Sequence, residues 1–390
     1  MKGTGLISSD MTLVQKFLQE HGLETLQERY RIIAKPGMQY PNLYSLKYNM
    51  IESPMNDQIV RECRGIVVDA ADNWRVVARP FDKFFNIGEE HAAQIDWDSA
   101  AVLEKLDGSL MILYYYAGDW RVASSGTPDA SGSPHNSTLF ASFADLFWHT
   151  FHIEKYDVPP TSLRDWTFMF ELMTPHNRVV VPHKDFRLTL IGARNSVTGR
   201  EFPVWAEDLS NLENRTLAEY IDTLRRVKPL EIKSFEEMIA SVPTLDPMQQ
   251  EGYVVVDRHF RRVKLKTPAY VAVAHMRDSF SLKTAIEIVR QGESSEVCSY
   301  FPEYQETLDR VSEEYDRLVT ALEECYEKIK GIEDQKSFAL EALKSPFSDC
   351  MFRLRKGQTD SVRAYLRDCN VNRLEAFFKK ALNKSTEAAA

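Results

Sequence analysis

The residues best suited to chemistry surround one lysine, in the stretch Glu104-Lys105-Leu106-Asp107-Gly108-Ser109-Leu110. A short apolar run, 100–103, precedes this lysine, and the turn pair Asp107-Gly108 separates it from a second apolar run, 110–116. Lys105 is therefore expected at the edge between two strands, where its side chain can face a cleft. Taken alone, the pattern is more typical of an ordinary surface lysine beside a turn.

A second group of charged residues lies in Val263-Lys264-Leu265-Lys266. Alternate side chains of a strand point to opposite faces, so Lys264 and Lys266 would share one face about 7 Å apart. Two ammonium groups at this spacing suit a phosphate, although a solvated lysine face on a half-buried strand gives the same pattern. Glu251, just before Gly252 and an apolar strand, fits a metal ligand, a ribose ligand or a charged strand end.

Further polar residues stand at strand ends or among aromatic side chains. Glu171 ends the apolar strand 168–172 and fits either an ion pair with Arg178 or a bond to a ligand hydroxyl. Arg64 leads into a strand, and Lys83 is followed by two phenylalanines. Basic residues among aromatic rings suit a nucleotide or phosphate pocket. They equally suit the packing of long basic side chains on rings.

Composition sets the limits for these hypotheses. The chain has 390 residues, enough for two domains with their own cores, and a net charge of −9. This charge argues against a basic coat for nucleic acid but allows a local basic cleft. Five widely spaced cysteines without a C-x-x-C pair disfavour a zinc site or a disulfide framework and fit a reducing cytosol. No charged-then-apolar signal segment opens the chain, and no apolar run has membrane-spanning length, so a cytoplasmic protein without a membrane partner is expected.

The elements that must position these residues change character along the chain. Up to about Thr267, strands joined mostly by hairpins predominate, which predicts an α+β domain of antiparallel sheets with flanking helices. The expected hairpins include 66–68 with 75–78 and 252–257 with 260–266. Beyond this region, apolar residues recur at spacings of three and four over 308–329, as on one face of a long helix. We therefore expect two domains, 1–278 and an all-α domain at 279–390.

The order of the motifs is more specific than any of them alone. Along the chain come Arg64-Gly65, Lys83-Phe84-Phe85-Asn86, Lys105-Leu106-Asp107-Gly108, a strand ending in Glu171, Glu251-Gly252 and Lys264-Leu265-Lys266. This order resembles the covalent nucleotidyltransferases, the superfamily of ATP-dependent ligases and mRNA capping enzymes.

Fuller motifs narrow the resemblance. Glu62-Cys63-Arg64-Gly65-Ile66, Arg79-Pro80 with the Lys83 motif, and Phe170-Glu171-Leu172 followed by Asn177-Arg178-Val179-Val180 are similar to the tRNA-repair RNA ligases of T-even phages, the RNA ligase 1-like family. The resemblance covers roughly 44–279, whereas the C-terminal region matches only in being helical.

This resemblance implies a nucleotidyltransferase domain, an ATP-grasp-like ligase fold, in which Lys105 attacks the α-phosphate of ATP and retains AMP. By the same resemblance, Lys264 and Lys266 would stabilise the α-phosphate, and Arg64 and Lys83 would grip the outgoing phosphates. The attacking amine must be neutral, whereas free lysine titrates near ~10.4. The two strand lysines are therefore expected to lower the pKa of Lys105 by their charge.

The other implied roles concern the nucleoside and the metal. Glu171 would hold the ribose hydroxyls, Tyr48 would lie near the nucleotide, and Glu104 would help present the backbone that recognises adenine. Glu251 would help bind Mg²⁺ or Mn²⁺, since both ions favour oxygen ligands. AMP would then pass to the 5′-phosphate of an RNA, and a 3′-hydroxyl would displace it to seal the strand.

One departure and two alternatives accompany this hypothesis. The family usually has a basic residue before a glycine in the strand after the nucleophile, and Ala123-Ser124-Ser125-Gly126 offers none, so one phosphate or ribose contact is missing or supplied elsewhere.

A DNA ligase or capping enzyme shares the core but normally places an OB fold of five strands after the Lys264 motif, where helices are expected here. A non-catalytic RNA-binding relic is the other alternative, against which the intact motifs count.

The expected substrates are RNA ends that carry a 5′-phosphate and a 3′-hydroxyl, plausibly in a cleaved tRNA, with the helical domain choosing the RNA. The chain has no G-x-x-x-x-G-K-[ST] motif for phosphorylating RNA ends. A separate end-healing kinase or phosphatase is therefore implied. For a phage-encoded protein, the place of action would be the host cytoplasm.

Overall fold

The computed structural model describes residues 11–134, 137–210, 212–278, 280–292, 294, 297–298 and 301–388. The chain divides into two compact units, Met1–Ala274 and His275–Ala390. The expected division at 278/279 lies close to this point, with Ser279 itself outside the described residues.

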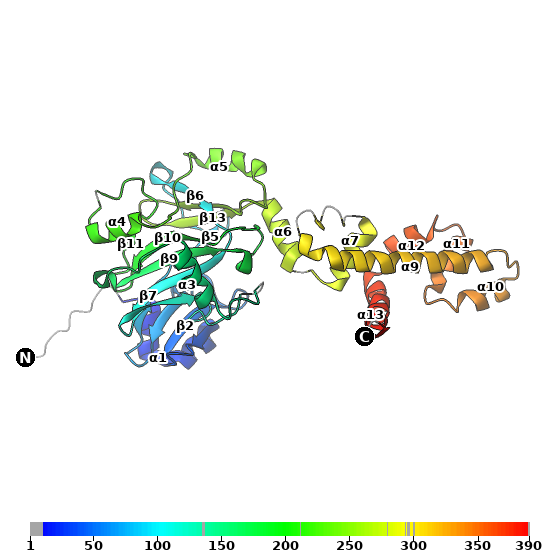
Figure 1. Ribbon diagram of the computed structural model, residues 1–390, viewed down its shortest axis with the longest axis horizontal. Coiled ribbons are helices and arrows are strands. Elements are labelled where there is room, and N and C mark those ends of the chain that lie inside the picture. The colour runs from blue at the N-terminus through cyan, green and yellow to red at the C-terminus, as the bar shows by residue number, and fades with distance from the viewer. Residues whose placement is uncertain are drawn as a thin grey trace, which may run out of the picture. The chain divides into compact units, whose positions relative to one another are not determined.

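Three sheets form the first unit (Figure 1). Its strands are β1 Ile32–Pro36, β2 Leu43–Tyr48, β3 Arg64–Asp69, β4 Arg75–Ala78, β5 Phe85–Asn86, β6 Ala101–Lys105, β7 Ser109–Tyr116, β8 Asp119–Ser124, β9 Trp166–Met173, β10 Arg187–Asn195, β11 Glu201–Phe202, β12 Gly252–Val256 and β13 Arg262–Lys266. The sheet orders are β1-β2-β3-β4, β11-β10-β9-β7-β8 and β5-β13-β12-β6. The pairs are antiparallel except β5 with β13, which is parallel.

Helices cover the outer faces of this stack. They are α1 Leu13–Tyr30, α2 Gln58–Glu62, α3 Phe143–Ile153, α4 Arg215–Asp222 and α5 Phe235–Ser241. An apolar cluster joins α1 to the first sheet through Val14, Leu18 and Ile66. A second cluster joins α5 to the third sheet through Met238 and Tyr253. In Figure 1 the three sheets accordingly lie between α1 and α5.

The two expected hairpins that flank the site motifs are present, as β3–β4 and β12–β13. In the second one, Val263 is buried and Leu265 packs against the same apolar cluster, as strand alternation predicts. Helix α4 ends at Asp222. Asp222 is followed by a turn from which Val227 enters the core.

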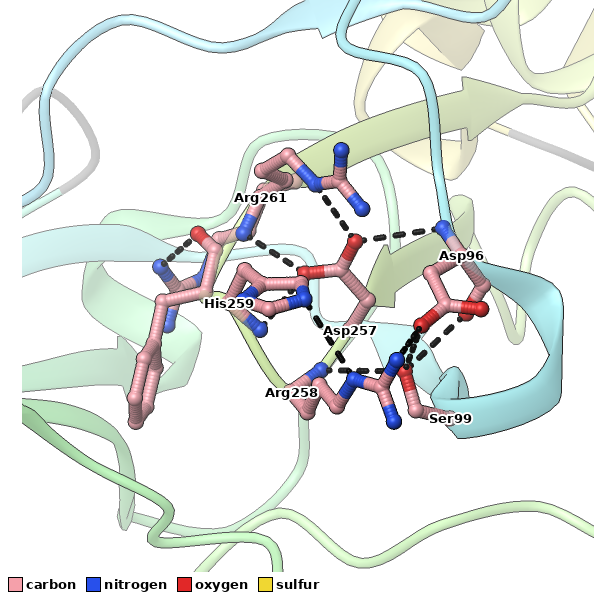
Figure 2. A network of polar contacts seen from close by, with 8 residues as sticks. Asp96, Ser99, Asp257, Arg258, His259 and Arg261 are labelled. Carbon is pink, nitrogen blue, oxygen red and sulfur yellow. Dashed lines mark hydrogen bonds and ion pairs between the residues drawn. The ribbon is translucent and has the colours of Figure 1, made fainter.

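A buried aspartate ties the tip of the β12–β13 hairpin to the segment before β6 (Figure 2). Asp257 is fully buried, and its Oδ2 accepts hydrogen bonds from Asp96 N at 3.1 Å and Arg261 Nε at 2.7 Å. Its Oδ1 accepts from His259 N at 2.9 Å. Arg258 extends the network through an ion pair with Asp96 at 3.0 Å. These bonds fix β6, β12 and β13 relative to one another at one end of the sheet.

The second unit is helical. Helix α6, Pro268–Asp278, runs across the boundary between the two units. The helices that lie wholly within the second unit are α7 Leu282–Gln291, α9 Gln305–Ile329, α10 Gln335–Ala342, α11 Ser348–Arg355, α12 Val362–Asp368 and α13 Val371–Ala388. The apolar face expected over 308–329 is the buried face of α9, against which α7, α10, α12 and α13 pack. The predicted class, an α+β domain of antiparallel sheets followed by helices, is confirmed. None of the described residues after Lys266 belongs to a strand, whereas the DNA ligase and capping-enzyme alternatives would place an OB fold of five strands there.

Candidate active site

The end of the third sheet away from Asp257 brings two lysines and a glutamate together. Gly252 of β12 pairs with Lys105 of β6 on one side and with Lys266 of β13 on the other. Glu251, just before β12, bonds both lysines: Oε2 lies 2.5 Å from Lys105 Nζ, and Oε1 lies 2.9 Å from Lys266 Nζ. Glu251 is only 3% exposed, so one buried carboxylate holds two ammonium groups.

Gly252 makes this close pairing possible. Its φ is +150°, and a Cβ built there would lie 2.0 Å from the carbonyl oxygen of Leu265. A larger residue would push β12 and β13 apart at the position where Glu251 bridges the two lysines. The Glu251-Gly252 pair is therefore required by local geometry as well as by its charge.

A cavity of about 200 Å³ opens beside this cluster. Its polar lining comes from five strands and carries both signs of charge; the charged and hydroxyl residues are Tyr48, Arg64, Glu104, Lys105, Glu171, Arg262, Lys264 and Lys266. Its apolar wall is made by Phe81, Phe84, Leu103, Leu106, Ile191, Trp205, Val227 and Val254. A cavity with both an apolar wall and charged side chains suits a flat base attached to a polyanion.

Burial and mutual repulsion shape the charges in the cavity. Burial, reinforced by the positive charges of Lys105 and Lys83, lowers the pKa of Lys264 to about 8. Burial also raises the pKa of Glu171 to about 7, although the positive charge of Lys105 opposes this shift. Burial likewise raises the pKa of the Glu104 carboxyl. The expected lowering of the Lys105 pKa stays a prediction.

Arg64 carries an unsatisfied donor into the cavity. Its Nη1 is buried and has no hydrogen-bond partner in the part of the chain that the structure describes. Burial lowers the pKa of the guanidinium, with Tyr48 and Glu171 acting in the opposite direction. The guanidinium carbon lies 5.2 Å from the ring centre of Phe84. A buried, unsatisfied cationic donor is costly unless an anion binds to it.

Asp107 holds the segment after the lysine in place. Its Oδ2 accepts hydrogen bonds from the backbone of Val180 and Val181 at 2.8 and 2.6 Å, and its Oδ1 accepts from Tyr270 Oη at 2.8 Å. Asp107 is only 4% exposed. The Asp107-Gly108 pair was expected only to form a turn. Instead, the aspartate joins three separate segments, and Gly108 allows the chain to pass close to the carbonyl of Leu172.

The sequence-predicted site residues therefore converge. Tyr48, Arg64, Glu104, Lys105, Glu171, Lys264 and Lys266 line the cavity, and Glu251 bonds two of them. Lys83 lies beside the cavity, with its Nζ 4.8 Å from the ring centre of Tyr48. Glu62 of the Glu-Cys-Arg-Gly motif is structural, because its carboxylate accepts a hydrogen bond from Val14 N in the first turn of α1.

Sequence reasoning missed Arg262 and the apolar wall. Arg262 shares the strand face of Lys264 and Lys266 at the same spacing of two, so alternation offered a signal for it. Ile191, Trp205 and Val227 come from separate segments and carry no sequence signal beyond their hydrophobicity. Only the folded sheets bring them together.

The comparisons with known proteins identify the family of this chain. The model of a family described as RNA ligase matches residues 62–270, which is more than half of the chain and includes every residue that lines the cavity except Tyr48. The chain therefore belongs to the RNA ligase family, and the predicted family and enzyme class, RNA ligase, are confirmed.

Two relatives and one solved structure illustrate the likeness. The RNA ligase of Rhodothermus phage RM378 is 26% identical over 381 residues, covering 83% of this chain and 85% of the relative. A putative bifunctional polynucleotide kinase/RNA ligase of Autographa californica nuclear polyhedrosis virus is 24% identical over 311 residues, covering 75% of this chain but only 42% of that relative. An archaeal ATP-dependent RNA ligase has a TM-score of 0.43 at 14% identity, covering 86% of this chain and 90% of the other.

Proposed function

We propose that this RNA ligase is ATP-dependent and joins 5′-phosphate and 3′-hydroxyl RNA ends through a covalent lysyl-AMP. The observation that carries the proposal is the position of Lys105. Its side chain lines the same cavity as Lys264, Lys266 and Arg64, and Nη1 of Arg64 has no hydrogen-bond partner among the described residues. A lysine placed among surplus cations suits attack on a phosphate, because those cations stabilise the charge of the transition state.

Lys105 is the proposed nucleophile. Its Nζ attacks the α-phosphorus of ATP, the bond to the β-phosphate breaks, and pyrophosphate leaves with the electron pair. The amine must be neutral when it attacks, and the Glu251 carboxylate, 2.5 Å from Nζ, is placed to receive its proton. Lys264 and Lys266 contribute positive charge next to the reacting phosphate.

The remaining residues are proposed to hold the nucleotide. Arg64 and Lys83 bind the outgoing phosphates, with Tyr48 beside them. Glu171 accepts hydrogen bonds from the ribose hydroxyls, and Glu104 lies with the backbone at the adenine end. The apolar wall would contact the base. These roles follow from the family resemblance together with the place of each residue in the cavity.

The residues present also fit a divalent ion. Glu251 and Glu171 supply carboxylate oxygens, the ligands that Mg²⁺ and Mn²⁺ favour, and Mg²⁺ is usually bound by one or two carboxylates plus substrate phosphates. The described residues contain no cluster of three candidate metal ligands, so phosphate oxygens and water would complete the shell. When bound, the ion would neutralise phosphate charge. Glu251 is the proposed ligand, on which a metal and the Lys105 ammonium compete.

The substrate is proposed to be broken RNA, plausibly tRNA, chosen by the helical unit. The relative from Autographa californica nuclear polyhedrosis virus is described as a kinase and ligase in one protein, and this chain spans less than half of it. The chain has no G-x-x-x-x-G-K-[ST] motif, which supports the proposal that kinase and phosphatase activities come from a separate end-healing enzyme. No helix in the described part of the chain is long and apolar enough to cross a bilayer. The free cysteine thiols support the proposal of a cytoplasmic place of action.

The test is to incubate the protein with Mg²⁺ and ATP labelled on the α-phosphate, then separate it on a denaturing gel. We expect label on the protein band that is absent in Lys105→Ala and retained in Lys35→Ala, an exposed lysine of β1. Labelled protein should then transfer AMP to RNA that carries a 5′-phosphate.

Absence of label would contradict the proposal, provided that bound AMP had first been removed with pyrophosphate and that GTP and NAD had been tried. RNA binding without label would favour the non-catalytic RNA-binding relic. Sealing of nicked DNA in preference to single-stranded RNA would favour the DNA ligase.

A further inference from the structure

A second cavity of about 200 Å³ lies next to the nucleotide cavity and shares Phe81, Phe84 and Arg262 with it. The rest of its lining is Gln58, Arg61, Asp82, Lys83, Phe85, His91, Ala93, Glu201 and Phe260. The roles proposed so far use only Lys83 from this set.

Three basic side chains surround one phenylalanine in this cavity. The Arg61 guanidinium carbon lies 5.5 Å, and Lys83 Nζ 4.9 Å, from the ring centre of Phe85. The His91 ring lies edge-on to the same phenylalanine with its centre 5.6 Å away. Three groups that can donate hydrogen bonds to an anion therefore contact the same buried aromatic ring.

The acidic residues of the cavity are already paired. Asp82 Oδ1 lies 2.9 Å from Arg194 Nη1, and Glu201 Oε2 lies 2.6 Å from Arg262 Nη2. Neither Arg61 nor Lys83 forms an ion pair with a carboxylate among the described residues. The cavity consequently has positive charge available for an incoming anion.

Arg61 and Lys83 are held before any ligand arrives. Arg61 Nε donates to the carbonyl of Met55 at 2.9 Å, and Nη2 donates to that of Asn56 at 3.2 Å. The backbone of Lys83 donates to the carbonyl of Arg61 at 2.8 Å. These bonds leave Arg61 Nη1 for a ligand. A preorganised donor binds an anion with little loss of side-chain entropy.

Lys83 connects the two cavities. Its Nζ lies 4.8 Å from the ring centre of Tyr48, which lines the nucleotide cavity, and 4.9 Å from that of Phe85, which lines the second. A phosphate held by Lys83 can therefore belong to either cavity.

The chemistry of the second step requires such a site. In the first step pyrophosphate leaves on the side of the phosphorus opposite the lysine, because attacking and leaving groups lie in line. In the second step an oxygen of the RNA 5′-phosphate attacks the same phosphorus, the P–N bond breaks, and its electron pair returns to Lys105 Nζ, which takes up a proton. The RNA phosphate must enter from the side that pyrophosphate left, where Lys83 is proposed to bind.

We propose that Arg61 and His91, together with Lys83, form the binding site for the 5′-terminal phosphate of the RNA. This inference rests on the proposed function, because it needs a lysyl-AMP that RNA can attack. The ligand class is a terminal phosphate dianion on a nucleic acid strand, which Arg61 recognises by charge and His91 by an additional N–H donor.

The experiment compares binding of two RNAs to the lysyl-AMP form of the protein, prepared with ATP and Mg²⁺ and then freed of excess metal. The RNAs share one sequence and differ only in a 5′-phosphate or a 5′-hydroxyl. We expect the wild type to prefer the phosphate about tenfold or more, the scale of one or two charge-assisted hydrogen bonds.

Arg61→Gln and His91→Gln should each reduce this preference to roughly threefold or less, since each removes part of the phosphate contact. Arg215→Gln, which alters an arginine whose side chain is 90% exposed, should keep it. A loss of fold would weaken both RNAs equally, whereas loss of the phosphate site weakens only the phosphorylated RNA. Formation of lysyl-AMP from ATP serves as the folding control.

Retention of the full phosphate preference in both variants, with lysyl-AMP forming normally, would overturn this inference and leave the proposed function intact. Failure of the wild type to form lysyl-AMP would instead overturn the proposed function. Should Arg61→Gln not fold, His91→Gln gives the decision, because it leaves the bonds of Arg61 to Met55 and Asn56 in place. An unchanged phosphate preference in His91→Gln would then refute the site.

Discussion

Replacing Glu171 with glutamine should make the folded protein more stable while it removes the proposed ribose contact. The pKa of Glu171 rises from its ordinary value of 4.5 to about 7, chiefly because of burial. Between these values the folded chain holds a proton that the unfolded chain has released, so ionisation costs stability as the pH rises through this window. At about 1.4 kcal/mol per pH unit, the cost above pH 7 is about 3 kcal/mol.

Glu171→Gln removes this cost. We expect a gain of about 3 kcal/mol in the free energy of unfolding at pH 8, since the pKa of about 7 already includes the attraction to Lys105, and a gain below about 1 kcal/mol at pH 5. Urea denaturation at the two pH values measures both. Labelling with ATP should fall at least about tenfold, because a buried charge-assisted hydrogen bond to the ribose is lost.

The matched control is Glu28→Gln, which alters an exposed glutamate of α1 and should change neither quantity. An equal gain at pH 5 and pH 8 would refute the electrostatic reasoning, because neutral glutamine would then be stabilising for some reason other than charge. Lower stability at pH 8 would show that the cations of the cavity outweigh the cost of burial.

Two more predictions concern β13 and its partner strand. Lys264, with a pKa of about 8, should gain a proton when ATP binds near pH 8.5, because the phosphates favour its charged form. Calorimetry in buffers of different ionisation enthalpy measures this proton uptake. Proton uptake that persists in Lys264→Met would contradict the assignment to Lys264. Gly252→Ala places a Cβ 2.0 Å from the carbonyl of Leu265 and should cost about 3 kcal/mol of stability along with most lysyl-AMP formation. An unchanged denaturation midpoint in Gly252→Ala would show that β12 and β13 separate without strain.

The parts of the site that could be predicted from sequence depend on short-range geometry. Alternation along one strand placed Lys264 and Lys266 on the same face, and an apolar run ending in a charged residue placed Lys105 at the end of β6. Glu171 was also expected to end its strand, but β9 continues to Met173. These rules hold because the side-chain period of a strand is two wherever the strand pairs. They required no knowledge of which strand lies beside which.

The remaining parts depend on pairings between distant segments. Lys105 and Lys266 are brought to one carboxylate only because both β6 and β13 pair with β12. Asp107 bonds to Val180, Val181 and Tyr270, and none of these contacts leaves a mark in the local pattern. The pKa of Lys264 also depends on distant segments, because it is lowered by burial and by the charges of residues from other segments.

The third sheet shows why its two ends can serve different purposes. At one end, Asp257 is surrounded by donors from the hairpin turn and from Asp96, so its charge is fully compensated and the strands are fixed (Figure 2). At the other end, Glu251 has two ammonium partners, and Arg64 and Lys264 line the same cavity without an ion pair to a carboxylate among the described residues. Like charges so close repel one another unless an anion binds among them. The fixed end therefore keeps the strands in register while the other end holds unpaired positive charge, and a phosphate is the ligand that relieves it.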